Sequence, residues 1–341
     1  MKLKLLFILQ LFAAGVYAQE ETDSTVVIVA GQEASLVYNE GITAFNGGDY
    51  KKAAEDFSKA TEINGKFFQA HFNKGVTDLK QNLNQEALNS FSDAVALDKK
   101  NAKYYLGWAI ALARLRKYSE ALKMVKKAES LGYDESRIQY FYGYVYYLQG
   151  DNSKAVQAYT EAVNKNKKFA YAYCDRASAH LKAGNIKAAL DDYNTALEIM
   201  PSASFVYIRR AWAKAEQNNF SGAITDINTA ILIDKDKEYE YVNERANIFV
   251  KFNKYKQALN DFKFCLDKNP DCPDTYINMG NMCITQKKYA EAEKYFSSAL
   301  EKDPGNIAAY NNRANVRELQ FDLKGAAEDR RQAENFLNGL K

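Results

Sequence analysis

The sequence predicts an all-α protein assembled from nine helix–turn–helix units. Three observations lead to this prediction: a period of 34 residues, small residues that recur at fixed places in the period, and prolines that stand only at its edges. The units occupy residues 34–341, with one extra residue, Glu238, after the sixth. They start at Ala34, Phe68, Ala102, Ser136, Ala170, Ser204, Tyr239, Pro273 and Ile307, from which positions within a unit are numbered.

Each unit is expected to hold helix A at positions 2–14, a turn at positions 15–16 and helix B at positions 18–31. Position 8 is Gly or Ala in every unit, position 20 is always Ala, and position 27 is Ala except for Cys265 in the seventh. Such small side chains let helices approach closely, and a large apolar residue at position 24 fills the space beside them. The last unit departs from this pattern with Arg330 at position 24.

The four prolines agree with these boundaries. Pro201, Pro270 and Pro304 stand at position 32, just beyond helix B, where a residue without a backbone N–H does not interrupt the helix. Pro273 starts helix A of the eighth unit, and the first helical position tolerates a missing N–H. The prolines therefore support the same phase for all the repeats.

The N-terminal residues have the pattern of a secretory signal peptide. Residues 1–18 carry Lys2 and Lys4, then an apolar run of about 11 residues, then small residues before a cleavage site after Ala18. That run is shorter than the roughly 20 residues that span a bilayer, which argues against a membrane anchor. We therefore expect an exported chain, periplasmic or secreted, with a linker over residues 19–33 and no membrane span after cleavage. Within the linker, Val26–Ala30 is a short apolar run that is either a strand, a hook onto the first helix or a flexible connection.

The repeats resemble the tetratricopeptide repeat (TPR) family, as residues 276–304 illustrate (YINMGNMCITQKKYAEAEKYFSSALEKDP). The resemblance implies a right-handed α-solenoid of TPR units, whose A helices line a concave groove with positions 2, 5, 6, 9, 12 and 13. It also implies that this groove binds a protein or an extended peptide. His71 and Gln139 stand at position 4, where the family has a bulky aromatic residue, so we expect looser packing there.

Composition argues against catalysis, metal binding and nucleic-acid binding. Loss of Lys2 and Lys4 with residues 1–18 lowers the net charge from +3 to +1, and the basic residues form no stripe. The two His occupy core positions, no cysteine pair has metal-binding spacing, and no Gly-rich loop is present, so we expect no cofactor, no metal and no catalytic residues. A disulfide among Cys265, Cys272 and Cys283 stays open, because an exported protein permits one.

Arg at position 7 coincides with Asp at position 23 in four units. Position 7 lies on helix A and position 23 on helix B, so each pair is predicted to bridge the two helices of its unit as a structural ion pair. The pairs are Arg176 with Asp192, Arg210 with Asp226, Arg245 with Asp261, and Arg313 with Asp329.

Two sets of groove positions are candidate partner-binding residues. Units four to six have an aromatic surplus that predicts an aromatic floor for a partner's side chains; the alternative is that these rings pack against one another. The set is Tyr140, Phe141, Tyr144, Tyr147, Tyr171, Phe205 and Trp212.

Units seven to nine have asparagines instead, whose amides can hydrogen-bond the main chain of an extended peptide; a merely solvated face is the alternative. These are Asn243, Asn247, Asn278, Asn281, Asn311 and Asn315.

The sequence therefore predicts a non-catalytic scaffold or assembly factor of the cell envelope that holds a protein or peptide partner in its groove. One alternative is a glycan-binding module that stacks sugars on the aromatic floor. The least favoured is an envelope hydrolase using Glu240, Glu244 and Asp274, which lack a partnered base. Self-association into a homo-oligomer is not indicated, because the polar end of the last helix is typical of a solvated cap.

Overall fold

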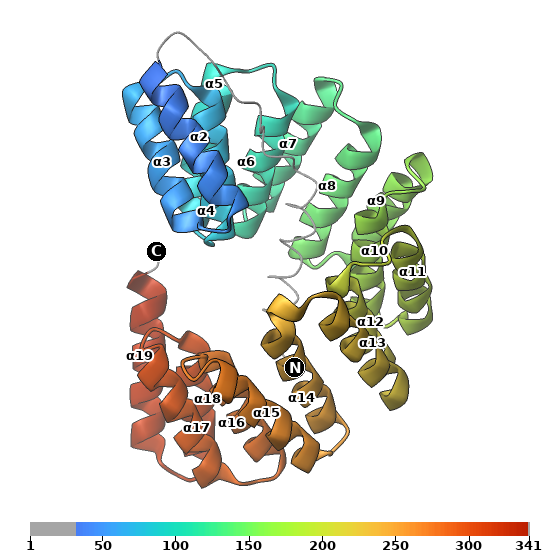
Figure 1. Ribbon diagram of the computed structural model, residues 1–341, viewed down its shortest axis with the longest axis vertical. Coiled ribbons are helices and arrows are strands. Elements are labelled where there is room, and N and C mark those ends of the chain that lie inside the picture. The colour runs from blue at the N-terminus through green and yellow to red at the C-terminus, as the bar shows by residue number, and fades with distance from the viewer. Residues whose placement is uncertain (1–31, 340–341) are drawn as a thin grey trace. The chain divides into compact units, whose positions relative to one another are not determined.

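The computed structural model describes residues 32–339, which are helical apart from turns (Figure 1). The predicted signal peptide and residues 19–31 of the predicted linker lie outside the described residues. The helices are α2 (Gln32–Asn46), α3 (Tyr50–Ile63), α4 (Phe68–Lys80), α5 (Asn84–Leu97), α6 (Ala102–Arg114), α7 (Tyr118–Ser130), α8 (Glu135–Gln149), α9 (Asn152–Lys165), α10 (Ala170–Lys182), α11 (Ile186–Ile199), α12 (Ser204–Glu216), α13 (Phe220–Ile233), η1 (Lys235–Lys237), α14 (Glu238–Lys251), α15 (Tyr255–Lys268), α16 (Pro273–Thr285), α17 (Tyr289–Lys302), α18 (Ile307–Leu319) and α19 (Leu323–Gly339).

The helices group into two compact units. The first includes α2–α11, which are repeats one to five, and the second includes α12–α19, which are repeats six to nine. Within each unit, every A helix packs against the B helix of its own repeat, and that B helix packs against the next A helix. The predicted all-α fold of nine helix pairs is therefore confirmed, and the extra residue of the sixth repeat adjoins the short 3₁₀ helix η1.

Most helices begin and end one residue earlier than the sequence pattern predicts, with helix A at positions 1–13 and helix B at positions 17–30. Side-chain caps at position 16 explain where helix B begins. The carboxylates of Asp49 and Asp151 accept hydrogen bonds from backbone N–H groups three residues on, at 3.0 and 3.1 Å. Asn219 and Asp322 do the same at 2.9 Å. Each bond satisfies a donor that the first turn leaves without a helical partner.

Position 15 adopts a left-handed backbone in all nine repeats. Glycine supplies this conformation at Gly48, Gly150 and Gly184, with φ of 81° to 90°. The other six repeats use Asn82, Arg116, Asn218, Asn253, Lys287 and Phe321, with φ of 57° to 65°. The turn geometry is therefore a property of the repeat, and it is imposed even on side chains that rarely adopt it.

Phe321→Gly is expected to raise the free energy of unfolding of the second unit by about 1 kcal/mol. Phe321 has φ of 65° and is 90% exposed, so its left-handed backbone conformation is disfavoured while its ring buries almost no surface. Urea unfolding followed by circular dichroism measures the change. Phe321→Ala is the control, because it removes the ring but keeps the Cβ atom; an equal gain in both variants would contradict the backbone explanation.

The core alternates small and large side chains where helices A and B of a repeat meet. A Cβ atom added at Gly143 would lie 2.6 Å from the Tyr159 ring, and one at Gly280 would lie 2.6 Å from the Phe296 ring. The alanines at positions 20 and 27, and Cys265, are all buried. Small residues at positions 8, 20 and 27 are therefore needed for the close approach that the sequence pattern predicts.

Candidate functional site

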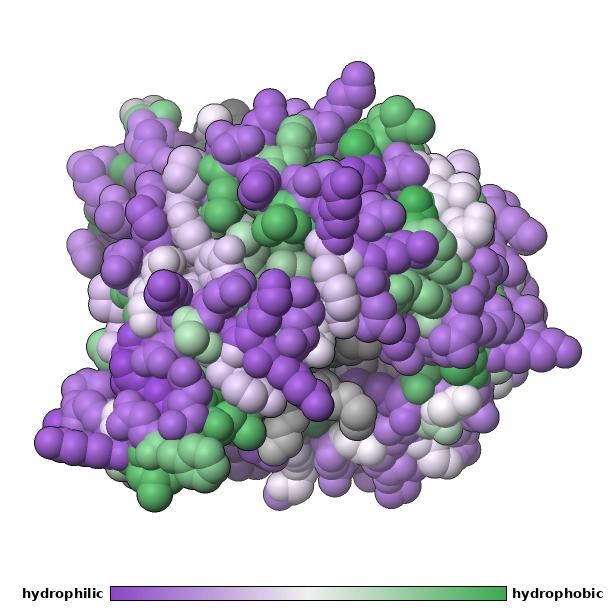
Figure 2. Space-filling model, turned by 90° about the horizontal axis from the view of Figure 1, so that it is seen from below, coloured by the Kyte–Doolittle hydropathy of each residue, from purple (hydrophilic) through white to green (hydrophobic). Residues whose placement is uncertain are grey.

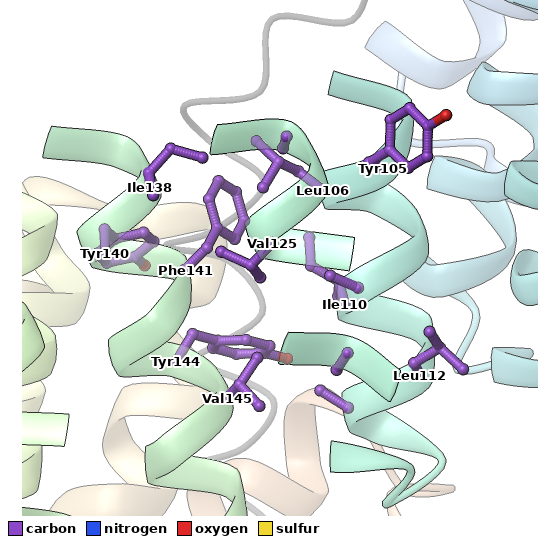
Figure 3. Packing of buried hydrophobic residues seen from close by; sticks show 14 of the residues in the cluster. Tyr105, Leu106, Ile110, Leu112, Val125, Ile138, Tyr140, Phe141, Tyr144 and Val145 are labelled. Atoms are coloured by element: carbon purple, nitrogen blue, oxygen red, sulfur yellow. The ribbon is translucent and has the colours of Figure 1, made fainter. Parts of the chain in front are cut away.

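Four of the predicted groove aromatics are buried in the core of the first unit. Tyr140, Phe141, Tyr144 and Tyr147 of α8 are each 5% exposed or less. Figure 3 shows Phe141 and Tyr144 extending from α8 toward side chains of α6 and α7 such as Leu106 and Val125. The expectation that these four rings form an open floor is therefore wrong, and the alternative of mutual packing holds for them.

The contacts of Tyr140 give the physical reason. Its ring lies 5.0 Å from that of Phe169, 5.6 Å from Tyr159 and 5.8 Å from Phe141 between centroids. Its hydroxyl donates a 2.6 Å hydrogen bond to the buried carboxylate of Asp175. The apolar ring therefore packs against other rings, and the polar hydroxyl has a hydrogen-bond acceptor, so Tyr140 can be buried where repeats four and five meet.

Tyr147 and Tyr171 occupy different environments in the same unit. The ammonium group of Lys182 lies 4.1 Å from the centroid of the buried Tyr147 ring, a cation–π contact between repeats four and five. Burial lowers the pKa of Lys182. Tyr171 is half-buried and packs on the edge of the same core, so part of its ring stays accessible.

In the second unit the predicted aromatics are only partly buried and are joined to charged side chains. The Trp212 indole N–H donates a 2.7 Å hydrogen bond to Glu244, whose side chain is buried. The guanidinium group of Arg209 lies 5.5 Å from the centroid of the half-buried Phe205 ring. Glu244 thus orients an indole from the preceding A helix, α12, and its burial separates it from the exposed Glu240 and Asp274.

The asparagines of repeats seven to nine form side-chain hydrogen bonds between successive A helices. Asn278 donates to Asn243 at 3.3 Å, and Asn312 donates to Asn281 at 3.4 Å. These bonds order the amides, and since each amide has two donor hydrogens and two acceptor lone pairs, capacity for further bonds remains.

The remaining predicted asparagines are more accessible. Asn247 is half-buried and Asn311 is exposed, while Asn315 accepts a 3.4 Å hydrogen bond from Arg330. The second unit therefore places three consecutive A helices with polar amides on one face, some fixed by their neighbours and some open to solvent. We call Asn243, Asn247, Asn278, Asn281, Asn311, Asn312 and Asn315 the amide face.

All four predicted ion pairs are present and bidentate. In each, Nε of the arginine donates to one carboxylate oxygen at 2.8–2.9 Å and a terminal nitrogen donates to the other at 2.6–2.8 Å. The aspartates are buried and the arginines are partly exposed. These ion pairs hold helix A to helix B. The arginine nitrogens that bond the aspartate are therefore not available to a substrate.

Sequence reasoning missed a third bond that Arg176, Arg245 and Arg313 make. The remaining terminal nitrogen donates to position 25 of the preceding repeat: Arg176 to Thr160 at 3.1 Å, Arg245 to Asn228 at 2.8 Å and Arg313 to Ser297 at 2.9 Å. The signal was available, because position 25 has an acceptor side chain in each case. The seventh repeat has Lys263 at position 25, and the eighth repeat, which follows it, has Met279 at position 7 in place of an arginine.

Cys265, Cys272 and Cys283 are free thiols, so the disulfide left open by the sequence is not formed. The Cys265 thiol donates to the backbone carbonyl of Tyr239, and burial raises its pKa to about 12. Burial lowers the pKa of His180, and His71 lies against the carbonyl of Gly65. Over residues 32–339, no group of three or more His, Cys, Asp or Glu side chains could hold a metal ion.

The helix pairs repeat along the chain, each pair is joined by a left-handed turn, and small residues of one helix pack against large side chains of the other. These features define an all-helical repeat protein. Models of the tetratricopeptide repeat family match residues 38–102, 106–173, 149–204 and 249–316, which together are more than half of the chain. The chain therefore belongs to the tetratricopeptide repeat family.

Two curated proteins are similar to parts of the chain. Human tetratricopeptide repeat protein 6 is 25% identical over 236 residues, which are 67% of this chain and 38% of that protein. Mouse tetratricopeptide repeat protein 12 is 29% identical over 87 residues, which are 25% of this chain and 12% of that protein. The chain thus spans less than half of the length of the curated relatives it matches.

Solved structures show the same fold. The human IFIT1 dimer with PPP-AAAA has a TM-score of 0.56 and 14% identity, covering 89% of this chain and 73% of that chain. A tetratricopeptide repeat protein from Parabacteroides merdae has a TM-score of 0.50 and 17% identity, covering 87% and 100%. At these identities the likeness concerns the fold alone.

On the face that Figure 2 shows, hydrophobic side chains form several groups among hydrophilic ones. Leu232 and Phe321 are the most exposed of the large hydrophobic residues in the part of the chain that the structure describes. Among the helices of residues 32–339, none has the length and apolar character of a membrane span.

Proposed function

We propose that this protein is a non-catalytic scaffold or assembly factor of the cell envelope that holds an extended peptide, or an extended segment of a protein, on its amide face. Membership in the tetratricopeptide repeat family supports a protein partner. The observation that carries the proposal is the series of asparagines on α14, α16 and α18, joined by hydrogen bonds between successive repeats.

The chemistry of the amide face favours a main-chain ligand. An extended peptide presents alternating N–H and C=O groups, and an amide side chain can bond both. Asn243 and Asn281 are held by their neighbours, so part of their side-chain entropy is already lost before binding. Recognition of this kind depends little on the sequence of the peptide, which suits a scaffold for several partners.

Other observations disfavour the two alternatives. Glycan stacking needs exposed rings, whereas four of the seven predicted aromatics are buried. Hydrolysis by paired carboxylates needs an acid and a base that face one substrate, and Glu244 is buried against Trp212 away from solvent.

Asn247→Ala combined with Asn311→Ala is expected to weaken peptide binding about tenfold, since each lost hydrogen bond contributes roughly 0.5–1.5 kcal/mol. The probe is a set of 12-residue peptides selected from a random library on the full chain, with affinities measured by calorimetry. Peptides of unrelated sequence should lose affinity to a similar extent, because the amides contact the main chain.

The matched control is Asn260→Ala with Asn335→Ala, which removes two exposed asparagines from helices α15 and α19 of the same unit. This variant should bind like the unaltered protein, and both double variants should keep its melting temperature. Equal affinity of the amide-face variant and the control would overturn the assignment of the binding face.

The envelope location rests on residues 1–18 and has its own test. Intact-mass measurement of the protein from its native cell should give a chain that begins at Gln19, in the periplasmic or secreted fraction. A full-length chain in the cytoplasmic fraction would contradict export. That outcome would not bear on peptide binding by the amide face, which the asparagine variants test.

A further inference from the structure

Repeat one lacks the arginine that completes a recurring ion pair. Aspartate stands at position 23 in five repeats, and in four of them arginine at position 7 bonds it through two nitrogens. In repeat one the aspartate is Asp56, but position 7 holds Glu40. Two carboxylates therefore occupy a site that elsewhere holds one carboxylate and one guanidinium group.

The surroundings of Asp56 show that this site is short of a cation. A Cβ atom added at Gly41 would lie 3.2 Å from the Cβ atom of Asp56, so Asp56 packs against α2 next to Glu40. Its Oδ2 atom is buried and has no hydrogen-bond partner among residues 32–339. Burial raises the pKa of Asp56, the nearby Lys52 lowers it, and the Glu40 carboxylate raises it.

Contacts between repeats show where a guanidinium group could come from. Arg176 at position 7 bonds Asp192 of its own repeat and also Thr160, which is at position 25 of the preceding repeat. Position 25 of one repeat thus lies beside positions 7 and 23 of the next. Arginine at position 25 can reach that aspartate from the preceding repeat, because its side chain is longer than that of threonine. Only repeat nine has arginine there, as Arg331.

Arg331 can exchange its present partner for another. Its exposed side chain pairs with the exposed Glu328 of the same helix at 2.8 Å, and surface pairs of this kind contribute little to stability. Arg330, the neighbouring residue, adds a second exposed positive charge to α19. The outward side of α19 is therefore basic where the outward side of repeat one is acidic.

Apolar side chains are uncovered on the same two sides. Position 3 is buried in repeats two to five, each of which follows another repeat, but Leu36 in repeat one is 63% exposed. Position 17 is half-buried in repeats six to eight, and Phe220 there packs on Phe249 and Phe252 of the next repeat. Leu323, at position 17 of repeat nine, is 68% exposed. Leu36 and Leu323 thus stand at positions that a neighbouring repeat covers elsewhere.

We propose that this chain associates head to tail with a second copy of itself, with α19 of one copy packed on α2 of the other as successive repeats pack. Arg331 then donates to Asp56 and Glu40 of the other copy, and Leu36 and Leu323 are covered. Such an interface is heterologous, so each added copy leaves another end to which a further copy can bind.

The arginines that make the last helix typical of a solvated cap are, in this assembly, the charges that face the acidic side of repeat one. The inference concerns repeats one and nine, and it does not depend on peptide binding by the amide face.

Sedimentation velocity of the full chain over a wide range of concentration tests the proposal. The mean mass should exceed that of one chain and rise with concentration. Arg331→Glu places a third carboxylate beside Glu40 and Asp56 and should weaken the association about tenfold at low ionic strength. Adding Glu40→Arg to that variant should restore the association, because arginine at position 7 can then bond both Asp56 and the introduced glutamate.

Lys324→Glu is the matched control. It makes the same change of charge on α19, but at position 18, which is exposed in every repeat. This variant should associate like the unaltered chain, and circular dichroism should show that all the variants are folded.

Photocrosslinking identifies the two surfaces that meet. A photoreactive p-benzoylphenylalanine in place of Leu36 should react with α18 or α19, and a mixture of ordinary and isotope-labelled chains should give crosslinks that join one of each. A single-chain mass at all concentrations, crosslinks within one chain, crosslinks between two α2 helices, or equal effects of Arg331→Glu and Lys324→Glu would each overturn the proposal.

Discussion

Asp329→Ala is expected to lower the free energy of unfolding of the second unit by about 3–5 kcal/mol. The Asp329 side chain is 2% exposed and accepts hydrogen bonds from Arg313 at 2.7 and 2.9 Å and from Arg317 at 3.0 Å. Its removal leaves two partly buried guanidinium groups without their shared carboxylate, and the cost of an uncompensated buried charge is of this size.

Urea unfolding of the full chain, with hydrogen exchange of α18 and α19 to locate the effect, measures this change. Exchange is needed because terminal repeats can unfold separately from the rest of an array. Glu328→Ala is the neighbouring control: it removes an exposed carboxylate paired with Arg331, and we expect no measurable shift.

A double variant separates loss of the ion pair from loss of packing. Arg313→Leu with Asp329→Leu replaces the bidentate pair by apolar side chains and leaves Arg317 bonded to its other carboxylate, Glu293, so it should recover a large part of the stability lost in Asp329→Ala. If the double variant were as unstable as the sum of its single variants, the uncompensated charge would not be the cause.

Phe91→Ala is expected to lower the free energy of unfolding of the first unit by about 3–5 kcal/mol, the usual cost of deleting a fully buried phenylalanine. Phe91 stands at position 24 of repeat two and has no exposed surface. Its ring fills the space left by two glycines, since a Cβ atom added at Gly75 would lie 2.9 Å from it and one at Gly107 would lie 2.5 Å from it.

Gly107→Ala supplies the test of that geometry. Alone it overpacks the ring and should cost about 1–3 kcal/mol, whereas in a Phe91→Leu background the added methyl group should cost much less. Leu83→Ala is the surface control, because that side chain is 42% exposed. Additive effects of Gly107→Ala and Phe91→Leu would show that the two side chains do not compete for one space.

Local repetition explains which features the sequence predicts well. The bridge between Arg176 and Asp192 joins residues 16 apart in one helix pair, and the same contact recurs three times, so the covariation of positions 7 and 23 is visible without coordinates. The bond from Arg176 to Thr160 crosses between repeats. Position 25 varies among Thr, Asn and Ser, so its common role as an acceptor becomes apparent only from the contact.

The left-handed turns illustrate a limit of residue preferences. Glycine at position 15 predicts a turn, but Arg116, Lys287 and Phe321 do not favour positive φ. These residues adopt it because the two helices of each repeat are fixed by packing at positions 8, 20 and 24. The turn between them is therefore determined by the packed helices and not by its own side chain.

The sequence by itself determined the number of repeats, the helix pairs, the small-to-large core and the four ion pairs, because each depends on contacts within one 34-residue unit. Only the tertiary structure decided which A-helix residues remain accessible, because that depends on how adjacent repeats stack. Tyr140 and Asn311 both stand at position 5, yet Tyr140 is enclosed by Phe169 and Tyr159 while Asn311 is exposed. Repeat position therefore identifies a face, and packing between repeats selects the residues of that face that can meet a partner.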